Sequence, residues 1–305
     1  MSARIGVIGS NMVDLVTTID RMPRIGETLE APAFSIGNGG KGANQAAAAA
    51  KLGADVLMVS RVGDDVFGAD TIANMQRLGI DTRHVHVVPG ASSGVAPIFV
   101  DANGDNSILI IKGANDHLLP DGVDEAAADL LDCGLIVLQL EIPLETVYHA
   151  IDWAHAAGKR VLLNPAPATQ ALSLERIAHV DFFMPNQTEL SILTGLPTSS
   201  AREAEAAARV LLDRGIGTIV VTLGADGALL VTADEVSLIP PVKVVARDTS
   251  GAGDAFIGAF AAHYVQDNDL HAALRQATRY AADSVTRPGT QKAFATAEEF
   301  SRLAL

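Results

Sequence analysis

The chain has 305 residues, of which 49% are hydrophobic and 19% charged, and its formal net charge is −14. This composition supports a large core and excludes an intrinsically disordered chain. The negative charge, with no Lys/Arg cluster, argues against nucleic acid or an anionic membrane as a partner. The single cysteine, Cys133, allows no intrachain disulfide and no thiolate metal cluster. The N-terminal apolar run is too short for a signal peptide and no stretch reaches membrane-spanning length, so we expect a cytoplasmic protein.

Short apolar runs alternate with alanine-rich helical runs along most of the chain. The predicted buried strands are Arg4–Ile8, Val56–Ser60, Leu135–Leu138, Arg160–Leu163, Phe182–Met184 and Thr218–Thr222. The predicted helices are Lys41–Leu52, Phe67–Leu78, Glu125–Leu131, Thr146–Ala157, Glu189–Thr194, Ala201–Asp213 and Ala255–Val265. Such a series of βαβ units predicts a mostly parallel sheet with helices on both faces.

Two segments, approximately 12–36 and 94–111, interrupt this alternation. The first has strand-like pieces separated by turn residues, and in the second two β runs flank the turn Asp101–Asp105. This turn contains Asn103-Gly104, which is a strong hairpin signal. Strands that do not alternate with helices predict a small β appendage, which could serve as a lid over a ligand at the ends of the parallel strands.

The segment Asp248–Phe256, with the sequence DTSGAGDAF, joins a β-rich run at Val242–Ala246 to the predicted helix Ala255–Val265. A helix that opens on Gly-Ala-Gly presents free N–H groups and the positive end of its dipole to an anion. Asp254 would repel a phosphate that is merely bound, whereas a phosphoryl-transfer site needs a base for the acceptor hydroxyl. A lone GxGD is also typical of an ordinary helix N-terminus, so its meaning depends on the rest of the chain.

A second glycine cluster lies at Phe34–Gln45. Its glycines at 37, 39 and 42 match the dinucleotide-binding pattern GxGxxG, but the expected acidic residue about 20 positions further on is not clearly placed. The same turn could instead place Lys41 and Asn44 beside a small polar ligand. The pattern supports these two interpretations equally, and a purely structural turn less well, because polar residues lead an otherwise alanine-rich helix.

Asn186 and Glu189 follow a predicted strand and open a helix. Three positions apart, they share one helix face and could contact a hydrated Mg²⁺ at a phosphate group. A capping box explains the same spacing, and by pattern alone we favour the cap.

Two further acids stand out. Glu141 directly follows a buried strand, where open α/β sheets bind ligands, although an ordinary surface acid would look the same. Asp14 lies inside an apolar run and therefore requires a partner. The eight histidines have no metal-ligand spacing, and the alternation of His84 and His86 favours a solvated strand face.

Taken together, these motifs resemble the PfkB carbohydrate kinase family over essentially the whole chain. Two signatures belong to the family as a whole: GGKGANQAAAAAKLGA at Gly39–Ala54 and DTSGAGDAF at Asp248–Phe256. The segments GSNMVDL, SSGVAPIFV, LLNPAPA and PNQTEL narrow the resemblance to ribokinases and 2-deoxyribokinases. The resemblance implies a single domain over residues 1–305 with a ribokinase-like three-layer α/β/α fold, a mostly parallel central sheet and a β lid. It also implies ATP-dependent phosphorylation of the 5-hydroxyl of a pentose.

The resemblance assigns roles to matching positions. Asp254 would be the base, and the anion hole would be formed by Gly251, Ala252 and Gly253. The sugar would be held by Met12, Asp14, Gly39, Gly40, Lys41, Asn44, Glu141 and Asp254. The Mg²⁺–phosphate water network would contact Asn186 and Glu189, and ATP would lie along Thr222, Gly224, Gly227 and Gly253.

The resemblance further implies a K⁺ site beside the anion hole. Its ligands would be the Asp248 side chain and backbone oxygens of Ser250, Ser284, Arg287 and Gly289. A cation there would pre-organise the N–H groups of the anion hole without touching the substrate. Ala293 stands where many ribokinases have a serine ligand, so we expect weaker activation by K⁺.

A second departure concerns the substrate, because Met12 stands where bacterial ribokinases often have an asparagine near the ring hydroxyls. A thioether cannot donate a hydrogen bond to a 2-hydroxyl, which favours 2-deoxyribose. An apolar site, however, discriminates against a substrate with an added hydroxyl only by about 10²-fold. We therefore predict that both pentoses are accepted. Ribokinase-like lid strands also suggest a homodimer formed through the lids. The alternatives are a nucleoside or fructose kinase, a non-catalytic sugar-binding regulator on the same fold, and a dinucleotide-dependent dehydrogenase.

Overall fold

The computed structural model describes residues 4–101 and 106–303 and is built around a nine-stranded sheet. The strand order is β13-β12-β11-β10-β9-β8-β1-β4-β5. The strands from β11 to β5 pair in parallel, and β12 and β13 add antiparallel pairs at one edge. The strand bounds are β1 (Arg4–Ile8), β4 (Asp55–Gly63), β5 (Asp81–Val88), β8 (Leu135–Leu138), β9 (Arg160–Leu163), β10 (Phe182–Phe183), β11 (Thr218–Thr222), β12 (Ala228–Val231) and β13 (Val236–Ile239).

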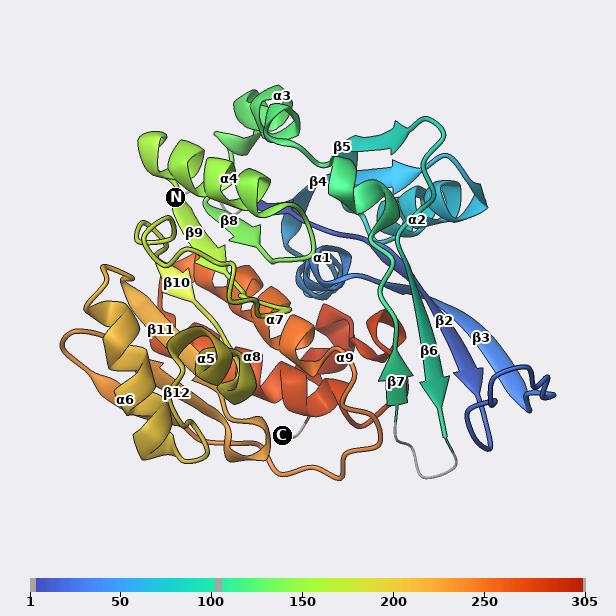
Figure 1. Cartoon of the computed structure of the whole chain (residues 1–305). Coiled ribbons are helices and arrows are strands. Elements are labelled where there is room, and N and C mark those ends of the chain that lie inside the picture. Colours follow the sequence, from blue (N-terminus) through green and yellow to red (C-terminus); the bar gives the residue numbers. More distant parts are fainter. Residues whose placement is uncertain (1–3, 102–105, 304–305) are drawn as a thin grey trace.

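Helices cover both faces of this sheet, which confirms the predicted three layers (Figure 1). One layer contains α1 (Lys41–Lys51), α2 (Val66–Arg77), α7 (Ala252–Asp267), α8 (Leu270–Ser284) and the short α9 (Ala297–Ser301). The other contains α3 (Pro120–Leu130), α4 (Leu144–Ala156), α5 (Gln187–Thr194) and α6 (Ala201–Leu212). Both faces of the strands are apolar because successive side chains point to opposite helix layers. In β8, Leu135 and Val137 pack on the first layer, and Ile136 and Leu138 pack on the second. No helix among the described residues combines the length and apolar character that crossing a bilayer requires.

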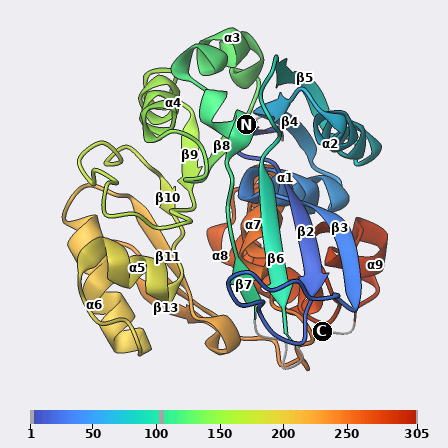
Figure 2. The same ribbon diagram turned by 45° about the vertical axis from the view of Figure 1, so that its right-hand side comes forward.

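The two interrupting segments form a separate four-stranded sheet, here called the lid, in the order β3-β2-β6-β7. Its strands are β2 (Met12–Thr18), β3 (Ala33–Gly39), β6 (Val95–Val100) and β7 (Asn106–Ile108). The lid strands project beyond the main sheet on one side of the molecule (Figures 1 and 2). Strands β6 and β7 pair antiparallel, as the hairpin signal predicts, although Asn103 and Gly104 lie outside the described residues.

One predicted element is wrong. The β-rich run Val242–Ala246 forms no strand and instead crosses the molecule as a loop. Pro240 and Pro241 precede it and cannot donate to a neighbouring strand, and Val245 is 85% exposed. Helix α7 begins at Ala252, earlier than predicted, directly after Gly251 in the left-handed conformation.

Candidate active site

Asp254 lies in the first turn of the 16-residue helix α7 and is only 6% exposed. Gly251 precedes the helix with a φ of 72°, a conformation that suits glycine, and no described side chain caps the helix. The N-terminal N–H groups and the positive end of the dipole therefore lie beside a buried carboxylate. This is the arrangement that the DTSGAGDAF segment predicts.

A cavity of about 860 Å³ opens in front of this helix end. It lies at the carboxyl ends of the parallel strands, since Asn164 follows β9, Met184 follows β10 and Thr222 ends β11. It brings together the predicted anion-hole and nucleotide residues: Asn186, Glu189, Thr222, Gly224, Gly227, Gly251, Ala252, Gly253 and Asp254. The loop that contains Val242–Ala246 lines the same cavity, as do Phe256 and Ile257 of α7 and Thr278 and Ala281 of α8. These apolar walls were not predicted as site residues.

Acidic residues gather where the lid joins the main sheet. Glu141 is 5% exposed, and its Oε2 accepts hydrogen bonds from Ser10 Oγ at 2.6 Å and from the Lys41 backbone N–H at 2.8 Å. Asp14, on β2, lies against the end of β3 so closely that a Cβ on Gly39 would meet its Oδ1 at 2.2 Å. The predicted sugar contacts on the lid, on α1 and after β8 therefore meet at one place.

The charges in this region influence one another. Burial, followed by the charges of Glu141 and Asp254, raises the pKa of Asp14 to about 6. Burial lowers the pKa of Lys41, but the carboxylates of Asp254, Glu141 and Glu189 outweigh burial and raise it. Lys41 is therefore held as a cation among the acids and also lines the cavity.

The GxGxxG pattern has no dinucleotide-binding context. Gly37 and Gly39 belong to β3, which pairs antiparallel with β2 in the lid rather than lying in the parallel sheet. A dinucleotide fold places its glycines directly after a parallel strand of the main sheet. The geometry therefore favours the small-ligand interpretation, with Lys41 opening α1 beside Glu141.

Asp254 is held by two amide side chains of α1. Asn44 Nδ2 donates to Oδ2 at 2.9 Å, and Gln45 Nε2 donates to Oδ1 at 3.0 Å. Asn44, predicted as a sugar contact, thus also bonds the predicted base. Gln45 was not among the predicted site residues, although its place next to Asn44 in an alanine-rich helix was an available signal.

Asn186 and Glu189 form the capping box that their spacing favours. Asn186 Oδ1 accepts from the Glu189 N–H, and Glu189 Oε2 accepts from the Asn186 N–H, both at 2.8 Å. Burial raises the pKa of Glu189, and the nearby Asp254 charge adds to this, while the Asn186 N–H and Lys41 oppose it. Because both residues also line the cavity, the cap places an amide and a carboxylate side chain at its edge.

The predicted cation loop is tied together by Asp248. Its Oδ1 accepts from the Ser250 N–H at 2.9 Å and its Oδ2 from the Gly289 N–H at 2.7 Å. Burial opposes ionisation, but these N–H groups outweigh it and lower the pKa of Asp248. In residues 4–101 and 106–303, no group of three or more His, Cys, Asp or Glu side chains could hold a metal.

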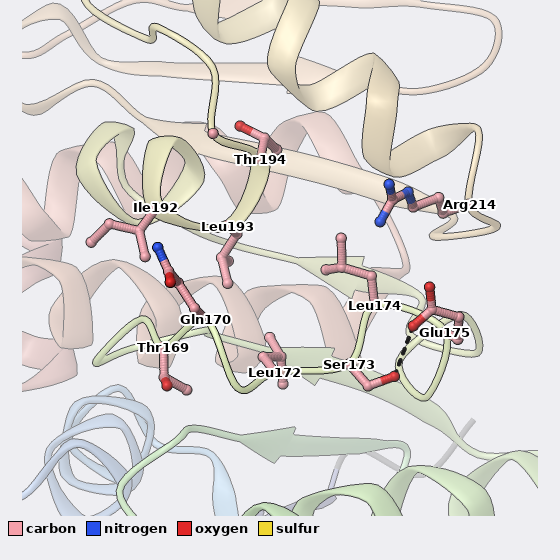
Figure 3. A pocket seen from close by; sticks show the side chains of 11 residues that line it. Thr169, Gln170, Leu172, Ser173, Leu174, Glu175, Ile192, Leu193, Thr194 and Arg214 are labelled. Atoms are coloured by element: carbon pink, nitrogen blue, oxygen red, sulfur yellow. Dashed lines mark hydrogen bonds between the residues drawn. The ribbon is translucent and has the colours of Figure 1, made fainter.

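A smaller cavity of about 330 Å³ lies elsewhere on the surface, between residues 169–175 and the C-terminal end of α5 (Figure 3). Ser173 Oγ donates to Glu175 Oε2 at 2.9 Å on its rim, and Arg214 also lines it. It contains none of the predicted site residues.

Residues 2–297 match the model of the pfkB family of carbohydrate kinases. The chain belongs to this family. It is 57% identical to a deoxyribokinase of Salmonella typhimurium and 38% identical to a ribokinase of Haemophilus influenzae. The first alignment covers 97% of both chains, and the second covers 98% of this chain and 97% of the relative. Among solved structures, the Arabidopsis thaliana ribokinase complexed with ribose and ATP matches with a TM-score of 0.91 and 31% identity, over 99% of this chain and 98% of that one. These matches confirm the predicted PfkB family and its ribokinase-like fold.

Proposed function

We propose that this PfkB-family protein is an ATP-dependent pentose kinase that phosphorylates the 5-hydroxyl of D-ribose or 2-deoxy-D-ribose. The observation that carries the proposal is the position of Asp254. Its buried carboxylate stands between the cavity of about 860 Å³ and the acidic cluster under the lid. The kinase relatives, and the Arabidopsis ribokinase structure complexed with ribose and ATP, support the same assignment.

In this proposal the sugar lies beneath the lid, with Asp14, Glu141 and the α1 residues around its hydroxyls. Asp254 accepts the proton of the 5-hydroxyl as that oxygen attacks the γ-phosphoryl group in line, and ADP leaves from the opposite side. The N–H groups of Gly251, Ala252 and Gly253 stabilise the charge on the transferring group. A non-catalytic sugar-binding protein would not need a base at this helix end.

We assign the cavity to ATP, along Thr222, Gly224 and Gly227, with the apolar walls beside its base. Asn186 and Glu189 would contact the water shell of Mg²⁺, which would neutralise phosphate charge. We place K⁺ at the Asp248 loop, with backbone oxygens of Ser250, Ser284, Arg287 and Gly289. Arg287 Nε donates to the Ala293 carbonyl at 3.0 Å. The Ala293 side chain has no hydroxyl that could bind K⁺, so we expect K⁺ to activate the enzyme only weakly.

The choice of pentose depends on Met12. This residue is 3% exposed and pairs with Gly39 in the lid sheet, two residues from Asp14. A buried thioether offers no donor to a 2-hydroxyl, so we expect 2-deoxyribose to be used at least as well as ribose. The 57% identity to a deoxyribokinase supports this expectation.

The test is ADP release with each pentose, with and without K⁺. We expect turnover of both sugars by the wild type and a fall of about 10³-fold or more in kcat for Asp254→Asn, with ATP affinity kept. Asp121→Asn, on the first turn of α3 and remote from the cavity, is the matched control. Near-normal kcat for Asp254→Asn would show that the base is misassigned. Turnover of nucleosides or hexoses but of neither pentose would overturn the proposed substrate.

A further inference from the structure

Two rows of amide side chains, buried except for the half-buried Asn74, converge on Asp254, one row for each carboxylate oxygen. In the first, Asn74 Nδ2 donates to Gln291 Oε1 at 2.9 Å and Gln291 Nε2 donates to Asn44 Oδ1 at 3.0 Å. Asn44 Nδ2 then donates to Asp254 Oδ2 at 2.9 Å. We call this row the Gln291 relay.

The second row reaches the other oxygen. Gln139 Nε2 donates to Gln45 Oε1 at 2.7 Å, and Gln45 Nε2 donates to Asp254 Oδ1 at 3.0 Å. Gln45 Nε2 also lies 3.1 Å from Asn164 Oδ1, and Asn164 donates in turn to the Met184 carbonyl at 2.9 Å. We call this row the Gln139 relay.

The Gln291 relay runs in one direction, because Gln291 and Asn44 each donate towards Asp254 and accept from the residue behind. In the Gln139 relay Gln45 does the same, whereas Asn164 donates away from Asp254 and Gln139 Oε1 has no partner among the described residues. An amide group that is buried cannot turn round without leaving a donor or an acceptor unpaired, which is costly. Asn44 is 6% exposed and Gln291 is 7% exposed, so water does not readily replace these partners. The Gln291 relay therefore fixes which end of the Asn44 amide faces the carboxylate.

We propose that Gln291 is a positioning residue for Asp254, acting through Asn44; this rests on the proposed function, in which Asp254 is the base. Gln291 is not among the residues that line the cavity, so it does not act by contacting ATP. Its backbone is held separately, since its carbonyl accepts from Lys51 Nζ at 2.8 Å. Its side chain can therefore be changed with the turn still anchored.

Other charges around Asp254 must stay constant in the test. The groups facing it from packed elements are Lys41 of α1, Asp14 of β2, Glu141 after β8 and Glu189 of α5. Gln291→Met leaves all of these charges unchanged. Methionine is close to glutamine in length, but it removes both side-chain hydrogen bonds that Gln291 makes, to Asn74 and to Asn44. A change in the pH profile of this variant then reports the relay and not a new charge.

For Gln291→Met we expect kcat to fall about 10- to 100-fold, as for a misplaced catalytic group, while the KM for ATP stays within about twofold. The acidic limb of the kcat profile should move to higher pH, because the ionised carboxylate loses a well-aligned donor. Gln76→Met, an exposed position of α2, is the matched control and should change neither quantity. If Gln291→Met does not fold, Gln291→Glu keeps the acceptor for Asn74 but cannot donate to Asn44, and the same fall in kcat is expected.

The two relays also predict a pattern of non-additivity. Asn74 and Gln291 act in series, so Asn74→Ala should lower kcat little further once Gln291 is Met. Gln139→Met acts on the other oxygen and should lower kcat again in the same background. Unchanged kcat and pH profile in a folded Gln291 variant would overturn the inference. Absence of any pentose turnover by the wild type would instead overturn the proposed function.

Discussion

At the scale of single residues, the proposed sugar site is an acidic pocket with one compensating cation. Burial makes the largest contribution to the raised pKa of Asp14, and the charges of the nearby Glu141 and Asp254 raise it further, to about 6. Lys41 is the basic residue held among them. Sugar hydroxyls can replace the water that burial removes from the carboxylates, so binding and ionisation of Asp14 are linked.

This linkage predicts that pentose affinity depends on pH. Asp14 is ionised above about pH 6 and then accepts charge-assisted hydroxyl hydrogen bonds; below that pH it takes up a proton, which removes the charge and leaves fewer and weaker acceptor sites. The Kd for pentose, measured by calorimetry without ATP, should therefore rise as pH falls through about 6. Asp14→Asn should bind more weakly at neutral pH and show a flatter profile. A wild-type Kd that is constant between pH 7 and 5 would contradict the assignment.

Only part of this site can be predicted from the residues themselves. Asp254, Lys41 and Asn44 stand in short contiguous segments whose glycines and polar residues are locally unusual. Gln291 carries no such signal, because a single amide in a loop has many ordinary uses. Its bond to Asn44 joins positions 247 residues apart, and only the packing of α1 against the C-terminal turn creates it.

At the scale of elements, the N-terminus of α7 is the feature to which we assign phosphoryl transfer. Gly251 and Gly253, at this helix end, differ in whether the backbone and its surroundings leave room for a side chain. A Cβ on Gly251 would meet Thr290 Cγ2 at 2.4 Å, and its φ of 72° is strained for other residues. A Cβ on Gly253 would meet no described atom within 4 Å, because it would project into open space at the cavity.

Replacing each glycine by alanine should therefore separate stability from catalysis. Gly251→Ala should lower the free energy of unfolding by about 1–3 kcal/mol through strain and the contact with Thr290. Gly253→Ala should leave stability unchanged or raise it by up to about 1 kcal/mol, since alanine favours a helix, while kcat falls because the methyl group occupies the phosphoryl position. Thermal unfolding and ADP release on both variants check this. Normal kcat for Gly253→Ala would place the phosphoryl group elsewhere.

The elements themselves were predictable where burial dictates the residue pattern. Strands β1, β8, β9 and β11 have the predicted bounds because a strand covered on both faces is continuously apolar. The predicted elements omit β5, β12, β13, α8 and the short α9. For α8 the N-cap Asp269 and the spacing of Ala273, Leu274 and Ala277 were available signals. The loop at Val242–Ala246 resembles a strand because Val242, Val244 and Ala246 alternate to line a cavity instead of a sheet, while Val245 is exposed.

At the scale of the whole molecule, the lid has two faces with different surroundings. Residues paired directly across strands share a face, so Gly37 and Ala96 share the face of Asp14, which we assign to the sugar. The opposite face carries Leu15 beside Ile36 and Thr17 between Phe34 and Phe99. Phe34 is 60% exposed and Ile36 is 50% exposed, which leaves an apolar surface without a cover in the monomer.

We propose that this outer face pairs with the same face of a second copy, because a self-complementary apolar patch suits a two-fold dimer. The double variant Phe34→Asp/Ile36→Asp should then sediment as a monomer, while the wild type sediments as a dimer at the same concentration. Leu238→Asp is the matched control, since Leu238 is 54% exposed but lies on β13, an edge strand of the main sheet, and should leave the dimer intact. A monomeric wild type would contradict the proposal. A dimer that persists in the double variant would place the interface on another surface. If the dimer also orders the lid, the monomeric variant should show a raised KM for pentose with little change in the KM for ATP, because the nucleotide cavity is lined without any lid residue.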